Sequence, residues 1–332
     1  MQAALPASRG VVTEAVFDYW RGGPPPLHPR RLARGISDPL TDDDLHLALW
    51  ACYQLHYGGF RGLDDALEWD PSTLALRGAL EHPFEQALRE EHLASSLPAD
   101  ARLALETVAT WPSPPLARTV EEHGQRWQVQ EFAVHRSAYQ LKEADAHTWA
   151  IPRLKGPGRS AMVRIQADEY GVGASAAHAE LFVAAMEDLD LNPSTGHYID
   201  LLPGVTLATD NLVSMFGLHR RLRGALVGHL ALFEMCSSVP MSRYLVAAER
   251  LGGMPALEEF YRVHVEADVH HADIALNEMV RPLVDAEPEL APEVAFGAAA
   301  LQRVEGRLAR HLLEEWGRTR SSLRQPLLTS VA

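Results

Sequence analysis

The chain has 332 residues, of which 47% are hydrophobic and 22% charged, and its formal net charge is -14. Its length and apolar content suit one large or two small globular domains. The acidic balance and the absence of a Lys/Arg-rich run argue against nucleic acid or an anionic membrane as a partner, since both bind through basic patches. Only Cys52 and Cys236 occur, which excludes a disulfide scaffold and a cysteine-rich zinc motif.

The N-terminal residues favour an arm that precedes the main domain. Met1 to Val12 has neither the basic nor the apolar part of a signal peptide, and no stretch approaches the roughly 20 apolar residues that span a bilayer, so we expect a cytoplasmic protein. The run Gly22-Gly-Pro-Pro-Pro-Leu-His-Pro29 cannot continue a helix. We therefore predict a partly flexible arm with one short helix over 1–35, a single helical domain over 36–320 and a tail over 321–332.

After the arm, helical periodicity alternates with Pro or Gly stops. Thr41 followed by three aspartates predicts a helix start with a hydroxyl cap, and that helix runs to Gly58. Lys155-Gly-Pro-Gly-Arg-Ser160 lacks the ending of a phosphate loop and is interpreted as a turn. Gly124 to Phe132 is the one candidate for a short strand, so an all-α fold is expected. Further helices are predicted over 71–92, 98–110, 137–146, 158–170, 174–189, 207–236, 241–252, 255–281 and 291–316.

The predicted helix over 255–281 carries the clearest functional pattern. At 100° per residue, His264, Asp268 and His271 form one stripe along two turns. Val263, Ala267 and Ile274 lie close to this stripe, so it belongs to an inward face. A buried ionisable row needs a partner, and a metal suits imidazole and carboxylate together. The alternatives are a solvated polar stripe and a core histidine bonded to the aspartate.

Two other segments offer further ligands. Glu234 lies deep in an apolar segment just before Pro240, and acids are rarely buried unless paired. Glu169 and His178 flank a break at Gly171 and Gly173 that could bring both side chains toward one site. The alternative for this second pair is an ordinary loop with two unrelated polar residues.

Together these segments supply three histidines and three carboxylates. The set suits two irons, or a mixed iron and manganese pair, because the carboxylates offset much of the metals' charge. Structural zinc would typically be held with cysteine, and the two Glu-x-x-His pairs of a ferritin-like site are absent.

At these residues the sequence resembles the haem-oxygenase-like diiron oxidases and oxygenases, which are also called iron-containing redox enzymes. The resemblance extends from about Asp38 to Trp316. It is carried by Asp168-Glu-Tyr-Gly with His178, Gly228-His-Leu-Ala-Leu-Phe-Glu234, Ser238-Val-Pro240, His264-Val-Glu-Ala-Asp268-Val-His-His271, Asp38-Pro-Leu-Thr-Asp-Asp-Asp and Tyr53-Gln-Leu-His-Tyr. One departure is Gln54, where a glutamate would be expected.

The resemblance implies a haem-oxygenase-like helical bundle with additional N-terminal helices and two non-haem irons, with manganese an alternative at one position. It implies Glu169, His178, Glu234, His264, Asp268 and His271 as ligands, with Asp168 the alternative to Glu169. Four further residues lie near the expected ligands in the sequence and are candidates for orienting them through hydrogen bonds. They are Asp168, His229, Glu266 and His270.

By the same resemblance, the diferrous site would bind O2, form a peroxo-bridged diferric species and oxidise a small molecule, such as an amino-acid-derived or natural-product substrate. The electrons would come from the substrate or an external donor, and homodimerisation is expected by analogy alone. Two rival functions are a cofactorless or thiamine-salvage-like enzyme on the same bundle and a non-enzymatic helical binding protein.

Overall fold

The computed structural model describes residues 2–173 and 176–327, and this part of the chain is helical. It contains no β-strand there, only an isolated bridge between Ala3 and Phe60, so the all-α prediction is confirmed. The α-helices are α1 (Val11–Trp20), α2 (Pro29–Ala33), α3 (Asp43–Gln54), α4 (Pro71–Leu93), α5 (Ala101–Ala109), α6 (Leu116–His123), α7 (Arg126–Gln140), α8 (Asp145–Thr148), α9 (Gly156–Glu169), α10 (His178–Asp188), α11 (Gly204–Leu218), α12 (Arg223–Leu251), α13 (Pro255–Asp273), α14 (Arg281–Ala286) and α15 (Ala291–Gly317). The 3₁₀ turns are η1 (Asp65–Trp69), η2 (Ile151–Arg153), η3 (Ile199–Leu201), η4 (Arg220–Leu222) and η6 (Pro288–Leu290), and η5 (Ile274–Val280) is a π-helix.

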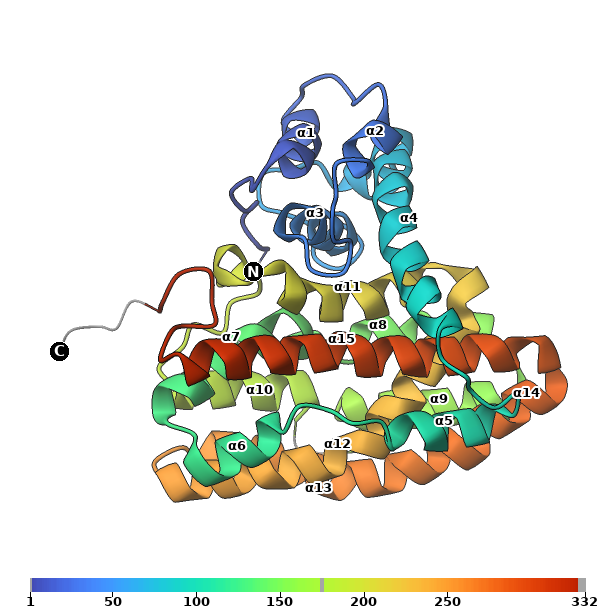
Figure 1. Ribbon diagram of the computed structural model, residues 1–332, viewed down its shortest axis with the longest axis vertical. Helices are drawn as coiled ribbons and strands as arrows, with labels where there is room; N and C mark the ends of the chain where they lie inside the picture. The colour runs from blue at the N-terminus through green and yellow to red at the C-terminus, as the bar shows by residue number, and fades with distance from the viewer. Residues whose placement is uncertain (1, 174–175, 328–332) are drawn as a thin grey trace.

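The helices form two groups that share one core. Figure 1 shows α1 to α4 gathered at one end and the long helices α12, α13 and α15 running across the other. Helix α12 packs against both α13 and α15, while α11 packs against α3 and α15 and so joins the two groups. The long helices that carry most of the candidate ligands therefore lie in the larger group.

Helices α12 and α15 meet at backbone contact. A Cβ at Gly228 would overlap the Val294 carbonyl, and a Cβ at Gly297 would overlap the Ala225 carbonyl. Only glycine permits this approach, because any side chain would force the helices apart. The close crossing fixes the position of the α12 segment that leads to Glu234.

The predicted N-terminal arm contains two helices rather than one. Val16 and Phe17 of α1 are fully buried, α1 packs on α3, and α2 packs on α4. The apolar side of α1 packs against the core, and this burial stabilises the arm.

Near the C-terminus, Ser322 is buried, and its backbone N–H and its hydroxyl donate to the Glu131 carboxylate at 2.9 and 2.7 Å. The division at 35 and 320 remains a prediction.

The start of α3 differs in detail from the prediction. The cap is the Asp42 carboxylate, which accepts from the backbone N–H groups of Asp44 and Leu45. The Thr41 hydroxyl instead donates to Asp38 at 2.5 Å. The helix ends at Gln54 rather than at the glycines, because the following residues form a tight turn onto the Gln54 carbonyl.

The predicted strand over 124–132 is wrong, since α7 begins at Arg126. Its buried residues Val129, Phe132 and Ala133 follow helical spacing, which outweighs the short alternating pattern. The predicted helix over 137–146 is divided between the end of α7 and the short α8, with a turn between them.

The prediction of one helix over 207–236 that stops before Pro240 is also wrong. Helix α11 ends at Leu218, where the Arg153 guanidinium donates to the carbonyls of Gly217 and Leu218. After η4, α12 runs from Arg223 to Leu251 and contains Pro240 in its interior. Packing on α13 and α15 stabilises α12 enough to retain a residue that lacks the N–H of a helix.

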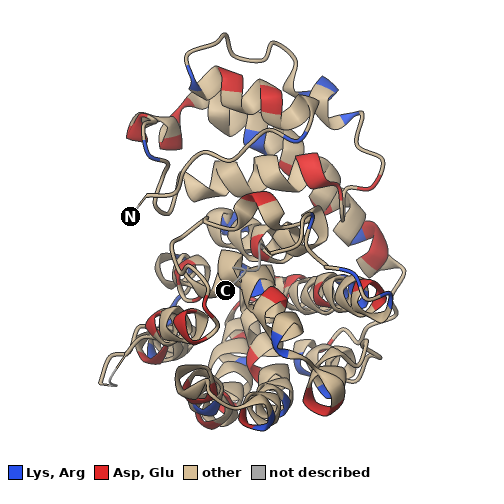
Figure 2. Cartoon of the chain, turned by 90° about the vertical axis from the view of Figure 1, so that its left-hand side faces the viewer, with Lys and Arg blue, Asp and Glu red and all other residues tan. Residues whose placement is uncertain are grey.

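Within the described residues, one helical stretch, Arg220–Leu251, is long and apolar enough to cross a membrane. In its most apolar part, 67% of the residues are buried inside the protein. The expectation that no stretch would qualify is therefore corrected. In the view of Figure 2, acidic and basic residues are interspersed over the helices.

Candidate metal centre

The predicted stripe on α13 is buried. His264, Asp268 and His271 have exposed fractions of 3%, 3% and 1%, so the stripe faces inward and is not solvated. The α-helix continues without interruption from Pro255 to Asp273, which keeps the three side chains on one face. The stripe therefore needs partners from the helices that α13 packs against.

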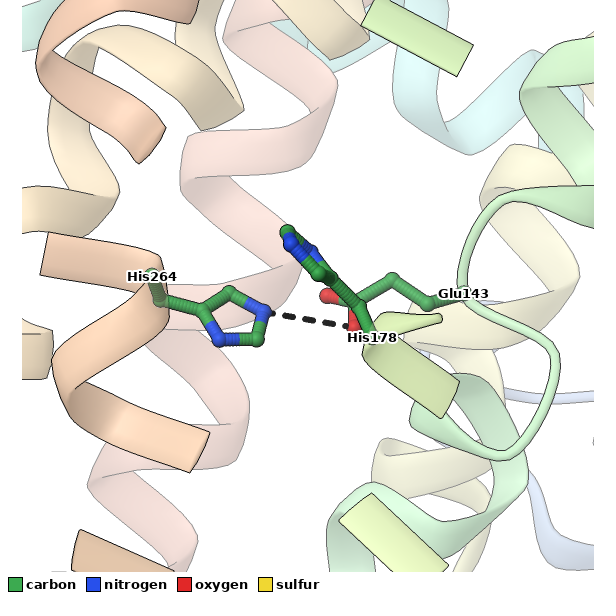
Figure 3. A group of neighbouring side chains, drawn as sticks. All are labelled: Glu143, His178 and His264. Carbon is green, nitrogen blue, oxygen red and sulfur yellow. Dashed lines mark ion pairs between the residues drawn. The ribbon is translucent and has the colours of Figure 1, made fainter. Parts of the chain in front are cut away.

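One group of partners surrounds His264. Potential ligand atoms of Glu143, His178 and His264 lie within 4.8 Å of one another, and all three residues are buried. His264 Nε2 is 3.5 Å from Glu143 Oε2, and the rings of His178 and His264 are 4.3 Å apart. Figure 3 shows the three side chains converging on a common point from three segments of the chain.

A second group surrounds His271. Potential ligand atoms of Glu169, Glu234 and His271 also lie within 4.8 Å of one another, and these residues are buried as well. His271 Nδ1 is 3.5 Å from Glu234 Oε2 and 3.7 Å from Glu169 Oε1. The stripe on α13 thus contributes one histidine to each of two adjacent groups.

The turn after α9 links the two groups. Gly171 and Gly173 have φ of +71° and +86°, which side chains rarely adopt, and a Cβ at Gly171 would collide with the Ala176 backbone. Glu169 precedes these glycines and His178 follows them, and Glu169 Oε2 lies 2.9 Å from His178 Nδ1. The glycine break brings together two residues that a straight helix would separate.

Asp268 lies beside the two groups without belonging to either. It lines a small cavity together with Glu143, Glu169, Glu234 and His264. Burial raises the pKa of Asp268, and the Ser237 hydroxyl partly opposes this rise. A rotation of its side chain toward the cavity would bring a further carboxylate to the groups.

Two of the residues predicted to orient the ligands, Asp168 and His229, lie close to the site but differ in what they contact. Asp168 Oδ2 lies 3.1 Å from His271 Nε2, on the opposite side of the ring from Glu234, so Glu169 and not Asp168 faces the cavity. His229 Nδ1 lies 3.1 Å from His147 Nε2, and His147 lines the same cavity whereas His229 does not.

Glu266 and His270 were predicted as further orienting groups, and this prediction is wrong. Both residues are exposed in the structure. Each lies two residues from Asp268 along the sequence, and 200° of helical rotation places it on the outer face of α13. They therefore cannot orient the inward-facing ligands.

The protonation of the buried groups depends on their mutual contacts. Burial alone would lower the pKa of His264, but Glu143 and Glu169 raise it to about 9. Burial would likewise lower the pKa of His271, but Glu234 and Asp168 raise it to about 9. Burial raises the pKa of Glu234 to about 7 despite His271. Without another cation, protons on the imidazoles compensate the buried carboxylates.

The donor set fits a pair of divalent metal ions. Glu143, Glu169, Glu234 and Asp268 are four buried carboxylates, and none has an ion pair with Lys or Arg in the described part of the chain. Two divalent ions would balance their charge. His264 Nδ1 donates to the Phe260 carbonyl at 2.7 Å, which leaves Nε2 free to bind. Among the residues that the structure describes, five buried atoms of the cluster make no hydrogen bond of good geometry, although some lie near an oppositely charged group. The five atoms are Glu143 Oε2, His178 Nδ1, Asp268 Oδ2, His264 Nε2 and His271 Nδ1.

Glu143 was missed by the sequence analysis. It lies in the turn between α7 and α8, where hydrophobic periodicity gives no signal of burial. The sequence holds one indication of its role, the spacing of four residues between Glu143 and His147, which would place both on one face of a helix. Both residues line the small cavity. Because both lie in short or irregular segments, only the tertiary structure gives that spacing its meaning.

Comparison with known proteins agrees with this geometry. A family model described as an iron-containing redox enzyme matches residues 130–306, a segment that contains the six residues of the two groups and also Asp268. Nitrosourea synthase from Streptomyces achromogenes subsp. streptozoticus is 25% identical over 159 residues, which is 47% of this chain and 34% of that protein. The chain thus matches about a third of the length of this curated relative. Since the family match covers more than half of the chain, the protein belongs to the iron-containing redox enzyme family.

Proposed function

We propose that this protein is a non-haem diiron oxidase or oxygenase that uses O2 to oxidise a small molecule. The observation that carries the proposal is the pair of adjacent buried groups, Glu143, His178 and His264 in one and Glu169, Glu234 and His271 in the other. Each group offers three ligand atoms to one ion, and Asp268 is within the same cavity. Iron, or iron with manganese at one position, suits such mixed carboxylate and imidazole ligands.

The chain's own residues would hold the metals and protect them from water. When bound, two ferrous ions would supply electrons to O2, with the balance drawn from the substrate or an external donor. Phe260 fixes the His264 ring through its carbonyl, and Asp168 accepts from the outer nitrogen of His271. Tyr139 and Phe233 form an aromatic part of the wall of the small cavity.

The relative's name supports oxidation at nitrogen. A nitrosourea contains an N-nitroso group, and 47% of this chain aligns with the protein named for making one. Among N-oxygenation, hydroxylation, desaturation and C–C cleavage, we therefore propose N-oxygenation as the first reaction to test. Because this chain aligns with only 34% of the relative, we do not propose that the two proteins share a substrate.

The test is anaerobic reconstitution of the full chain with ferrous iron, followed by metal counting and stopped-flow spectroscopy after addition of O2. We expect two irons per chain, O2 consumption that depends on the iron, and a transient visible absorption band. Less than one iron per chain, unchanged when His264 is replaced by alanine, would contradict the proposal. That result would favour a cofactorless enzyme or a binding protein on the same bundle.

The iron-free protein should become less stable as pH rises. The folded state raises the pKa of His264 and His271 from 6.5 to about 9, so the stability from these protons is complete below 6.5 and lost as pH approaches 9. Glu234, whose pKa is raised from 4.5 to about 7, contributes with the same sign at lower pH. Thermal unfolding across this range measures the effect.

Iron should abolish this pH dependence, because metal ions would replace the protons on the ligand atoms. The control is the iron-free variant in which both His264 and His271 are alanine, whose unfolding temperature should vary less between pH 6.5 and 9. A wild-type stability that rises over this interval would show that the imidazoles do not hold the protons.

A further inference from the structure

A larger cavity adjoins the metal centre. Its volume is about 410 Å³, within the range of sites that bind drug-sized molecules. Residues of α6, α7, α12 and α15 line it, and Tyr139 and Phe233 line both this cavity and the small one that contains the ligands. The ring centres of these two residues are 5.7 Å apart, and five of the seven candidate ligands, all but His178 and His271, line the small cavity. The two cavities therefore share the wall that these rings form, and the larger cavity lies beside the candidate metal centre.

The cavity wall is rich in aromatic rings. Aromatic residues make up six of the 27 lining residues but only 7% of the chain. The ring centres of Phe132 and Tyr244 are 4.8 Å apart and those of Tyr244 and Tyr261 are 5.6 Å apart, so these three rings form a row of contacts. Such rings favour an aromatic ligand through offset and edge contacts. The six are Phe132, Tyr139, Phe182, Phe233, Tyr244 and Tyr261.

The two half-buried arginines of the wall, Arg136 and Arg243, are already paired. Arg136 donates to both oxygens of Glu305 at 2.8 and 2.6 Å, and Arg243 pairs with Glu121. Arg118 also lines the cavity, but it is exposed to solvent. A buried carboxylate or ammonium group on a ligand would have to displace one of these pairs, whereas an uncharged ligand would not.

Pro240 removes one hydrogen bond from the part of α12 that borders the cavity. Proline has no N–H, so the Cys236 carbonyl, four residues earlier in α12, loses its helical donor. Cys236 and Pro240 both line the cavity and therefore share the face of α12 that borders it. A ligand N–H or O–H group can donate to this carbonyl.

We infer that this cavity is the substrate site and that it takes an uncharged aromatic or aryl-alkyl molecule with one N–H or O–H donor. The aromatic part packs on the rings, the donor reaches the Cys236 carbonyl, and the other end of the molecule lies toward Tyr139 and Phe233, beyond which lie the candidate metal ligands. The role as a substrate site rests on the proposed function, but the binding itself does not require iron.

The first test compares three probes by isothermal titration with the full chain, both iron-loaded under anaerobic conditions and iron-free. The probes are phenylbutanol, its methyl ether and phenylbutyrate. Phenylbutanol should bind about three- to tenfold more tightly than the ether, as one hydrogen bond allows. Phenylbutyrate should bind the iron-free protein more weakly than phenylbutanol. Tighter binding of phenylbutyrate to iron-free protein, or no binding of phenylbutanol up to its solubility limit, would overturn the inference.

Two variants locate the binding. Pro240→Ala restores an N–H to the helix and should remove the preference for the alcohol over the ether, while helix content measured by circular dichroism is retained. Gly306 lines the cavity, and a Cβ there would have only Pro114 within 4 Å, so Gly306→Trp should block the site and abolish binding of phenylbutanol. Gly78→Trp is the matched control, on an exposed face of α4 with open space around it.

The iron content of each variant separates the two proposals. Gly306→Trp and Pro240→Ala should bind as much iron as the wild type, because neither residue is among the candidate ligands. Unchanged probe binding in Gly306→Trp overturns the cavity assignment even if two irons are bound. Absence of iron with intact, Gly306-dependent probe binding contradicts the diiron function and leaves the ligand class standing.

Discussion

Replacing His264 or His271 by alanine should each remove about one of the two irons that the protein binds, and replacing both should remove nearly all of the metal. The two histidines belong to different groups, so each substitution deprives one ion of an imidazole ligand. Elemental analysis after anaerobic reconstitution measures the result. His270→Ala is the matched control, because this residue is exposed and adjacent in sequence to His271.

The same assay tests Glu143, the candidate ligand that only the structure revealed. Glu143→Gln should lower the iron content to the same extent as His264→Ala, because both side chains belong to one group. Combining these two substitutions should cost little more iron than either alone. Glu266→Gln, at an exposed position of α13, should retain both irons. Full iron occupancy in Glu143→Gln would remove this residue from the ligand set.

Lys142→Met should destabilise the protein by about 3–5 kcal/mol at neutral pH. The Lys142 ammonium lies 2.9 Å from the Asp210 carboxylate, which is 1% exposed, and 4.1 Å from the centre of the Tyr57 ring. Without the lysine, Asp210 is a buried charge with no partner. Burial already raises the pKa of Asp210, and Lys142 opposes that rise. Chemical denaturation of wild type and variant measures the difference.

Two controls distinguish the ion pair from a general effect of the substitution. Lys155→Met changes the same residue type at an exposed position and should alter the free energy of unfolding by less than about 0.5 kcal/mol. Lys142→Met combined with Asp210→Leu should recover much of the lost stability, since no buried charge remains. A loss in the double variant as large as in Lys142→Met would show that packing, and not charge, explains the effect.

The sequence determined those parts of the site that depend on local geometry. His264, Asp268 and His271 share a face because helical spacing fixes their directions, and their apolar neighbours imply that this face is buried. Glu234 was recognisable as an acid within an apolar segment. The glycine break also indicated that Glu169 and His178 could converge, and the positive φ of Gly171 accounts for their contact.

Other parts were decided by tertiary contacts. Glu143 is buried in a turn whose sequence has no apolar periodicity, so its burial depends entirely on which helices surround it. Pro240 ends most helices, but here packing on α13 and α15 continues α12 past it. Glu266 and His270 lie outside the centre because helical rotation turns them to solvent.

The length and the acidic charge of the sequence indicate only the broad class of protein, and they do not locate the site. Periodicity along one helix fixed which side chains share a direction, because that information is carried by neighbouring residues. Which of these side chains meet across the bundle depends on how distant helices pack, and that packing alone produces the two groups of ligands and the cavity beside them.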